Sequence, residues 1–241
     1  PKISVVTTVY NKEKSIRKCI ESILSQSFSD FELILVDDSS KDNSLEICKE
    51  YAAKDNRIKI ILRENGGHAI ARNTGIINSK GDYIIFVDGD DSFSDDHALA
   101  DLFRIAEIDK SDIVISDFLG SWNTEFVPFQ KLTGIKMLEF LISENFYHPT
   151  PCSRLFRREV FINNLFENLI SDDELWTPVT FYRANVVSIL NKSIYCRTTP
   201  DDSVTRIDSE QNYFRKANDK SLTAGLVINY FENQQIKTAS K

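Results

Sequence analysis

The sequence predicts an α/β protein with a mainly parallel central sheet and helices on both of its faces. Apolar runs typical of buried strands alternate with stretches of helical periodicity through the first hundred residues. Two of these runs, 31–36 and 83–87, end directly in acidic clusters, Asp37-Asp38 and Asp88-Gly89-Asp90-Asp91. Because ligands of open α/β sheets bind outside the carboxyl ends of the strands, we expect both clusters at one binding edge.

The first half of the chain supplies the pattern in order. Residues 3–8 form the first predicted strand, and apolar positions 16, 19, 20, 23 and 24 then lie on one helical face. The polar stretch 39–44 caps a helix that carries Leu45, Cys48 and Tyr51. Strands at 31–36, 58–62 and 83–87 and a helix at 68–78 complete the series. Such alternation favours parallel strands joined by right-handed crossovers.

The pattern loosens after about residue 120, and no linker separates a second domain. We therefore expect one domain with two halves, 1–120 and 121–241, the second of which adds a smaller extension to the sheet. The predicted later elements are helices at 99–108, 135–142, 174–184 and 213–231, strands at 112–118 and 193–197, a strand or turn at 152–156, and a loop at 120–133.

Composition limits the partners. The chain has 29 Lys and Arg against 36 Asp and Glu, a net charge of -7, and its basic residues are scattered, so we expect no nucleic-acid partner. No apolar run approaches the roughly 18 residues of a membrane span. The first strand begins almost at Pro1, which leaves no room for a signal peptide and predicts a cytoplasmic location. A tail outside this sequence would bring the domain to the inner face of the membrane.

The four cysteines do not form a metal motif. Cys19, Cys48, Cys152 and Cys196 are widely spaced, without a Cys-x-x-Cys pair. Cys19 and Cys48 lie on the apolar faces of predicted helices, where a reduced cysteine behaves as a small hydrophobic residue. We predict a core role for them rather than zinc binding.

Asp88-Gly89-Asp90 is an Asp-x-Asp element after a buried strand. Alternate residues point the same way, so both carboxylates can face one cation, and Gly89 allows close approach of a diphosphate. Hard oxygen ligands suit Mg²⁺ or Mn²⁺. The alternative is an ordinary turn, because Asp and Gly are common turn residues.

Asp37-Asp38 also has two interpretations. The carboxylates can cap the following helix, or they can accept hydrogen bonds from a nucleoside base or ribose. The first turn, 8–12, has no Gly-x-Gly-x-x-Gly, and the chain has no phosphate-loop motif. A dinucleotide-binding fold and a phosphate-loop ATPase or kinase are therefore disfavoured.

Four ordered motifs now form a recognisable set: 5–11, 36–40, 65–67 with 71–75, and 86–91. In these the chain resembles the family 2 glycosyltransferases, which have the GT-A fold. The resemblance covers residues 1 to about 100 and is looser beyond. There, 151–161 resembles the acceptor-side segment of bacterial members, and 171–176 resembles their Glu-Asp motif. Thr8 stands where proline is frequent.

The resemblance implies a function and a set of roles. It implies a metal-dependent inverting transferase that moves a sugar from a nucleotide-sugar donor, UDP-linked by expectation, to a carbohydrate or lipid-linked acceptor in polysaccharide synthesis. Half 1–120 would bind the donor and half 121–241 the acceptor. By this resemblance, the nucleotide sugar would contact Thr8, Tyr10, Asp37, Asp38, Arg72, Asn73, Asp88, Gly89 and Asp91. The Mn²⁺ or Mg²⁺ ligands would be Asp88 and Asp90. The general base would be Asp173, and Asp172 could exchange roles with it.

Other interpretations of the acceptor half remain open. Asp172 and Asp173 are also favourable at a helix N-terminus, where the helix dipole stabilises acids. His148, Trp176, Tyr195 and Arg197 are candidates to line the acceptor side, although an aromatic at helical spacing is usually core. The segment 195–206 resembles one that closes over the donor as a lid.

Two rival functions use the same residues. A nucleotidyltransferase also needs paired carboxylates and metal, but it normally has a glycine-rich first turn, which 8–12 lacks. A catalytically defunct nucleotide-binding or sugar-binding module is the non-enzymatic rival. The joint presence of Asp88, Asp90 and Asp173 counts against that module.

Overall fold

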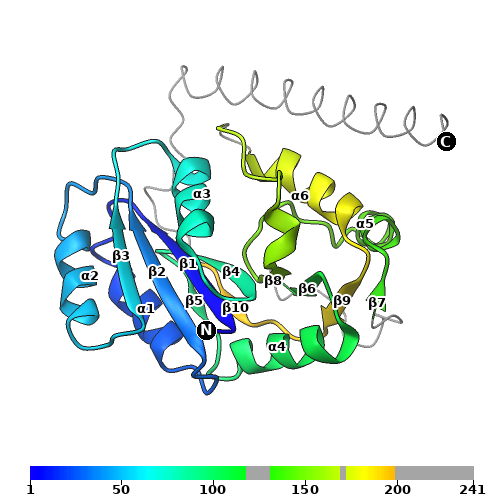
Figure 1. Cartoon of the computed structure of the whole chain (residues 1–241), viewed down its shortest axis with the longest axis horizontal. Helices are drawn as coiled ribbons and strands as arrows, with labels where there is room; N and C mark the ends of the chain where they lie inside the picture. The colour runs from blue at the N-terminus through cyan, green and yellow to red at the C-terminus, as the bar shows by residue number, and fades with distance from the viewer. Residues whose placement is uncertain (118–130, 169–171, 199–241) are drawn as a thin grey trace.

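The computed structural model describes residues 1–117, 131–168 and 172–198 of the 241-residue chain (Figure 1). The elements of the first half are β1 (Ile3–Val9), α1 (Ile16–Leu24), β2 (Phe31–Asp37), α2 (Ser44–Ala52), β3 (Ile58–Leu62), α3 (His68–Asn78), β4 (Tyr83–Asp88), β5 (Ser92–Phe93), α4 (Ala98–Asp109) and β6 (Ile113–Ser116). The remaining elements are β7 (Lys131–Leu132), α5 (Gly134–Ser143), β8 (Arg154–Arg157), a 3₁₀ turn η1 (Arg158–Phe161), α6 (Asp172–Arg183), β9 (Val187–Leu190) and β10 (Tyr195–Cys196).

The central sheet has eight strands in the order β3-β2-β1-β4-β8-β6-β9-β7. The first four are mutually parallel, as the alternating pattern predicted, and β1 lies between β2 and β4. Every residue of β1 is buried, which fits a strand covered on both faces. The mainly parallel α/β prediction is therefore confirmed.

Helices cover both faces of the parallel strands. Ile34 of β2 packs against Ala71 of α3. Its neighbour Leu35, which alternation directs to the opposite face, joins the main core with Cys19 of α1 and Cys48 of α2. The predicted core role of these two cysteines is confirmed, since both are fully buried.

Two later strands break the parallel pattern. Strand β8 lies antiparallel between β4 and β6, and β7 lies antiparallel to β9. Strand β9, parallel to β6, was not predicted, and neither was the short β5, which pairs with β10 in a second sheet. The predicted helix 213–231 and most of the predicted loop 120–133 lie outside the described residues.

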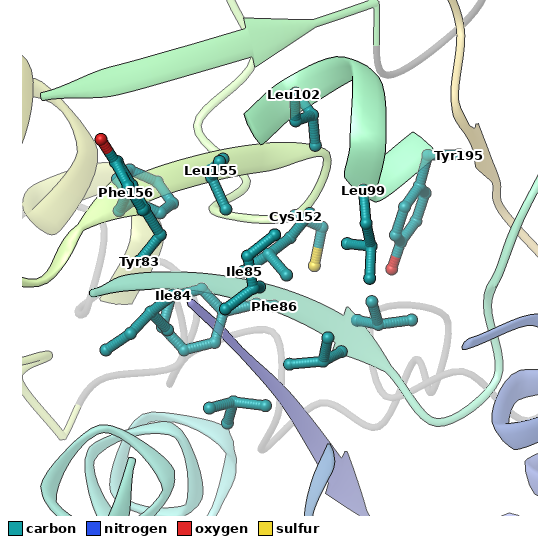
Figure 2. Close-up of a cluster of buried hydrophobic side chains, with 14 of the residues drawn as sticks. Tyr83, Ile84, Ile85, Phe86, Leu99, Leu102, Cys152, Leu155, Phe156 and Tyr195 are labelled. Atoms are coloured by element: carbon teal, nitrogen blue, oxygen red, sulfur yellow. The ribbon is translucent and has the colours of Figure 1, made fainter. Parts of the chain in front are cut away.

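One continuous core joins the two halves. Figure 2 shows apolar side chains from β4, α4, β8 and β10 converging, with Phe156 and Tyr195 among them. Phe86 of this cluster contacts the ring of Phe161, which in turn stacks on Trp176, so ring contacts extend the core. The site at the strand ends thus rests on one packed core.

Among the described residues, no helix combines the length and apolarity that a membrane crossing requires.

Candidate active site

The carboxyl ends of three neighbouring strands form the base of the site. In the sheet register, Thr8 of β1 lies opposite Val36 of β2 on one side and opposite Asp88 of β4 on the other. Asp37 and Asp88 therefore flank the end of β1. The predicted meeting of the two acidic clusters at one edge follows from this register.

Asp37 is buried at the end of β2. One of its carboxylate oxygens accepts a hydrogen bond from the Ser40 backbone N–H at 3.2 Å. The other oxygen, Oδ1, has no hydrogen-bond partner among the described residues. A buried acceptor without a partner is costly, so this atom has unused capacity for a donor such as a base N–H.

Asp38 is also buried, but its carboxylate is fully engaged. It forms an ion pair with Arg63 and accepts the backbone N–H of Gly66 and, at 2.8 Å, of Gly67. Gly67 has φ of 86°, a left-handed conformation that favours glycine, and α3 begins at the next residue. Asp38 thus fixes the loop that starts α3.

Arg72 connects the two acidic regions of the molecule. Its Nη2 lies 3.3 Å from Asp88 Oδ1, and its Nη1 lies 3.3 Å from Asp172 Oδ2. The guanidinium also stacks near the ring of Phe166, 5.5 Å from the centroid, and is almost completely buried. A planar guanidinium can serve two carboxylates at once, which an ammonium cannot do with the same geometry.

The buried charges shift the pKa values of both acids. Burial by itself raises the pKa of Asp88, but Arg72 and His68 outweigh it, and the net pKa lies below the ordinary value. For Asp172, burial is the largest effect and exceeds the attraction of Arg72, so its pKa rises to about 6. Asp88 is therefore held as a carboxylate, whereas Asp172 is poised to take up a proton.

Asp90 is paired with a lysine. Lys12 Nζ lies 2.5 Å from Asp90 Oδ2, and both side chains remain partly exposed. No group of three His, Cys, Asp or Glu side chains able to hold a metal occurs within the described ranges. Two carboxylates are nevertheless a donor set that fits Mg²⁺ or Mn²⁺, because such ions commonly take their other ligands from water and substrate phosphates.

Asp91 turns away from this pair toward β10. Its carboxylate accepts the Tyr195 hydroxyl at 2.9 Å and the Thr198 backbone N–H at 2.8 Å. Burial raises the pKa of Asp91 to about 7, despite these two donors. The Tyr195 hydroxyl in turn accepts the Asp88 backbone N–H at 3.1 Å. Tyr195 thus links the Asp-x-Asp turn to the start of the predicted lid, most of which lies outside the described residues.

The remaining predicted donor contacts differ in their surroundings. Thr8 Oγ1 lies 3.5 Å from His68 Nδ1, and Tyr10 is exposed at the rim. Asn73 exchanges two hydrogen bonds with the Phe166 backbone, at 2.8 and 2.9 Å. The Asn73 amide therefore holds the loop before α6 in place and through it the ring on which Arg72 rests.

The acceptor-side candidates separate into core and surface. Trp176 is buried, stacks 4.3 Å from Phe166, and donates its indole N–H to Asn164. Trp176 is therefore part of the hydrophobic core, which was the alternative to a role in lining the acceptor side. Asp173 lies beside Asp172 on the first turn of α6 and is partly exposed, and no ion pair ties it within the described ranges. His148 is half-buried and Arg197 exposed.

Sequence reasoning missed three residues at this edge. Lys12, Arg63 and His68 each contact a predicted site residue, namely Asp90, Asp38 and Thr8. His68 follows the Gly66-Gly67 pair and Lys12 follows the first strand, so both stand beside motifs that were recognised. Arg63 has no such signal, since its partner lies 25 residues away.

Comparisons with known proteins identify the family of this chain. The family model described as "Glycosyl transferase family 2" matches residues 4–165. The chain is 36% identical over 220 residues to the uncharacterized glycosyltransferase EpsJ of Bacillus subtilis, covering 86% of this chain and 64% of EpsJ. It is 31% identical over 225 residues to glycosyltransferase GlyA of Streptococcus pneumoniae, covering 87% of this chain and 32% of GlyA. The chain thus spans less than two thirds of either relative.

Solved structures share the fold. Staphylococcus aureus TarS, residues 1–349 in complex with UDP, superposes with a TM-score of 0.72 at 25% identity, over 96% of this chain and 72% of that chain. The mannosyltransferase PcManGT of Pyrobaculum calidifontis, in complex with GDP-Man and Mn²⁺, has a TM-score of 0.66 at 16% identity, over 84% of this chain and 58% of that chain. The second likeness shows the fold alone.

Proposed function

The chain belongs to glycosyltransferase family 2, and from this premise we propose that it transfers a sugar from a UDP-sugar to a hydroxyl group of a saccharide or lipid-linked acceptor. The observation that carries the proposal is the Asp88–Arg72–Asp172 connection, which joins the donor edge of the sheet to the acid pair of α6. The binding of UDP by TarS supports uridine as the base. Family membership disfavours the nucleotidyltransferase alternative.

The proposed donor site lies in half 1–120. Asp37 Oδ1 accepts a hydrogen bond from the base, Thr8 and Tyr10 border the nucleoside, and Asp91 lies near the donor sugar. Asp38 acts indirectly by fixing the Gly66-Gly67 loop. Asp88 and Asp90 would hold Mn²⁺ or Mg²⁺ together with the diphosphate, and the bound ion would offset negative charge on the departing nucleoside diphosphate.

The proposed acceptor site lies in half 121–241, with Asp173 as general base. Its partial exposure lets it reach an acceptor hydroxyl, whereas Asp172 is buried against Arg72. Removal of the hydroxyl proton by Asp173 would accompany attack on the anomeric carbon from the face opposite the leaving group. One displacement of this kind inverts the configuration. A cytoplasmic location, with access to lipid-linked acceptors at the inner membrane face, fits this role.

Calorimetric titration of UDP tests the donor site, with GDP and ADP as comparators. We expect UDP to bind in Mn²⁺, to bind more weakly in EDTA, and to lose the metal effect in Asp90→Asn. Failure of every nucleotide to bind in either condition would favour a defunct module.

Donor hydrolysis tests the base. Asp173→Asn should bind UDP like wild type but turn over a UDP-sugar at least a hundredfold more slowly, since general bases contribute about 10²–10⁴ in rate. Glu174→Gln, at a partly exposed position on the same helical turn, is the matched control. Equal turnover in wild type and Asp173→Asn would remove Asp173 from the base role.

A further inference from the structure

Lys12 is the cation nearest to Asp90, one of the two proposed metal ligands. It lies in the turn between β1 and α1, and its Nζ contacts Asp90 Oδ2 at 2.5 Å. Neither side chain is deeply buried, with 21% of the Lys12 side chain and 16% of the Asp90 side chain exposed. The contact is therefore reachable from solvent by a metal ion or a phosphate.

The backbone around Lys12 is fixed while its side chain keeps freedom. The Lys12 N–H donates to Ser44 Oγ at 2.6 Å, and its carbonyl accepts the Ile16 N–H at 2.8 Å where α1 begins. Ser15 Oγ donates to the Gly89 carbonyl at 3.2 Å, which ties this turn to the Asp-x-Asp turn. A fixed Cα with a four-carbon flexible stem allows the ammonium group to change partners without moving the backbone.

Gly89 leaves room for this side chain. A Cβ at position 89 would lie 3.4 Å from Lys12 Cγ and 2.8 Å from the Thr8 carbonyl oxygen. The lysine stem thus passes over the glycine to reach Asp90. The same glycine that was expected to admit a diphosphate also admits the lysine.

Each acid of the Asp-x-Asp turn has its own partner. Arg72 forms an ion pair with Asp88, and Lys12 forms one with Asp90. Asp91 instead accepts hydrogen bonds from two neutral donors. An ammonium group and a divalent ion cannot occupy the same carboxylate oxygen. A metal ion that binds Oδ2 of Asp90 would therefore displace Lys12, whose ammonium would then lie beside the place where the diphosphate oxygens are expected.

We propose that Lys12 is a built-in counter-cation, which holds Asp90 in the donor-free protein and turns to the diphosphate when the donor binds, with or without the metal. This inference rests on the proposed function. It makes Lys12 a positioning residue with two effects: it weakens metal binding in the absence of donor, and it provides the diphosphate with a cation when no metal is present.

The first test measures Mn²⁺ affinity of the donor-free protein, with free Mn²⁺ quantified by electron paramagnetic resonance. Lys12→Met keeps the stem and removes the charge, and we expect it to bind Mn²⁺ at least threefold more tightly than wild type. Lys14→Met, an exposed change of the same charge two residues away, is the control and should leave the affinity unchanged. Equal affinities in all three proteins, or equal shifts in both variants, would overturn the proposal.

The second test measures UDP binding in EDTA. Lys12→Met should bind UDP about tenfold more weakly than wild type, and Lys12→Arg, which keeps the charge, should remain within threefold. Unchanged UDP affinity in Lys12→Met would contradict the second effect. Lys12→Gln replaces Lys12→Met if that variant does not fold. If wild type binds no UDP even in Mn²⁺, the proposed function fails, while the Mn²⁺ titration still decides the role of Lys12.

Discussion

Arg72 and Asp172 lie 100 residues apart in sequence, yet Nη1 of the first lies 3.3 Å from Oδ2 of the second inside the protein. The same guanidinium holds Asp88 at the end of β4. One side chain of α3 therefore connects the proposed donor edge of the sheet with the first turn of α6. The precise placement of Asp173, the proposed base, depends on this buried contact.

Loss of Arg72 should weaken the whole molecule. Arg72→Met leaves the buried Asp172 and the partly exposed Asp88 without their cation, and breaking a buried pair such as Arg72–Asp172 costs about 3–5 kcal/mol. Urea unfolding monitored by circular dichroism measures the change. Arg104→Met removes an exposed arginine and should change the free energy of unfolding by no more than about 1 kcal/mol. Equal free energies of unfolding for the Arg72→Met protein and wild type would mean that the contacts of Arg72 make no net contribution to stability.

Asp172 should make stability depend on pH. Its pKa of about 6 exceeds the ordinary 3.8, so the folded state binds the proton more tightly than the unfolded state. The contribution of this group to the free energy of unfolding is therefore lost as pH rises from about 4 to about 6, and it does not change further above pH 6. Asp172→Asn cannot ionise and should gain about 1–3 kcal/mol relative to wild type across that window. Urea titrations at pH 4.5, 6 and 7.5 would show it, and a constant difference would contradict the raised pKa.

The adjacent acids Asp37 and Asp38 should behave differently. Asp38→Asn loses the Arg63 ion pair and weakens the bonds to Gly66 and Gly67, which should cost about 1–3 kcal/mol of folding stability. Asp37→Asn keeps a similar shape and leaves the Arg63 contact intact, so we expect UDP affinity to fall with a smaller change in stability. Thermal unfolding and UDP titration of both variants decide the matter. The reverse pattern would exchange the two roles.

The fold was readable from sequence wherever the polar boundaries were clear. Residues 58–62 and 68–78 match β3 and α3 to the residue, because polar and glycine residues flank both apolar patterns. Strand β9 was missed because its four residues, Val187–Leu190, are too short for a periodic signal and depend on pairing with β6 and β7, which are distant in sequence. Antiparallel β8 likewise depends on neighbours far away in sequence.

The candidate site, like the fold, was predictable only where its residues are neighbours in the sequence. The acids that end strands were predicted, because strand ends and local motifs are written in adjacent residues. Their partners were not, since the pairs Lys12–Asp90 and Arg63–Asp38 join residues 78 and 25 positions apart. Only the three-dimensional fold distinguishes Asp38, whose carboxylate is occupied by protein groups, from Asp37, which keeps one oxygen without a partner among the described residues.

Gly75 of α3 should be required for close packing on the sheet. A Cβ there would lie 2.2 Å from Val6 Cγ1 of β1, a distance that forces the helix or the strand to move. Gly75→Ala should therefore destabilise the protein by about 1–3 kcal/mol, although alanine is the better helix former. Val6→Ala in the same chain removes the clashing methyl groups, so the double variant should be more stable than the sum of the two single changes predicts. Urea unfolding of the four proteins measures this coupling, and strict additivity would show that α3 and β1 are not in the contact described.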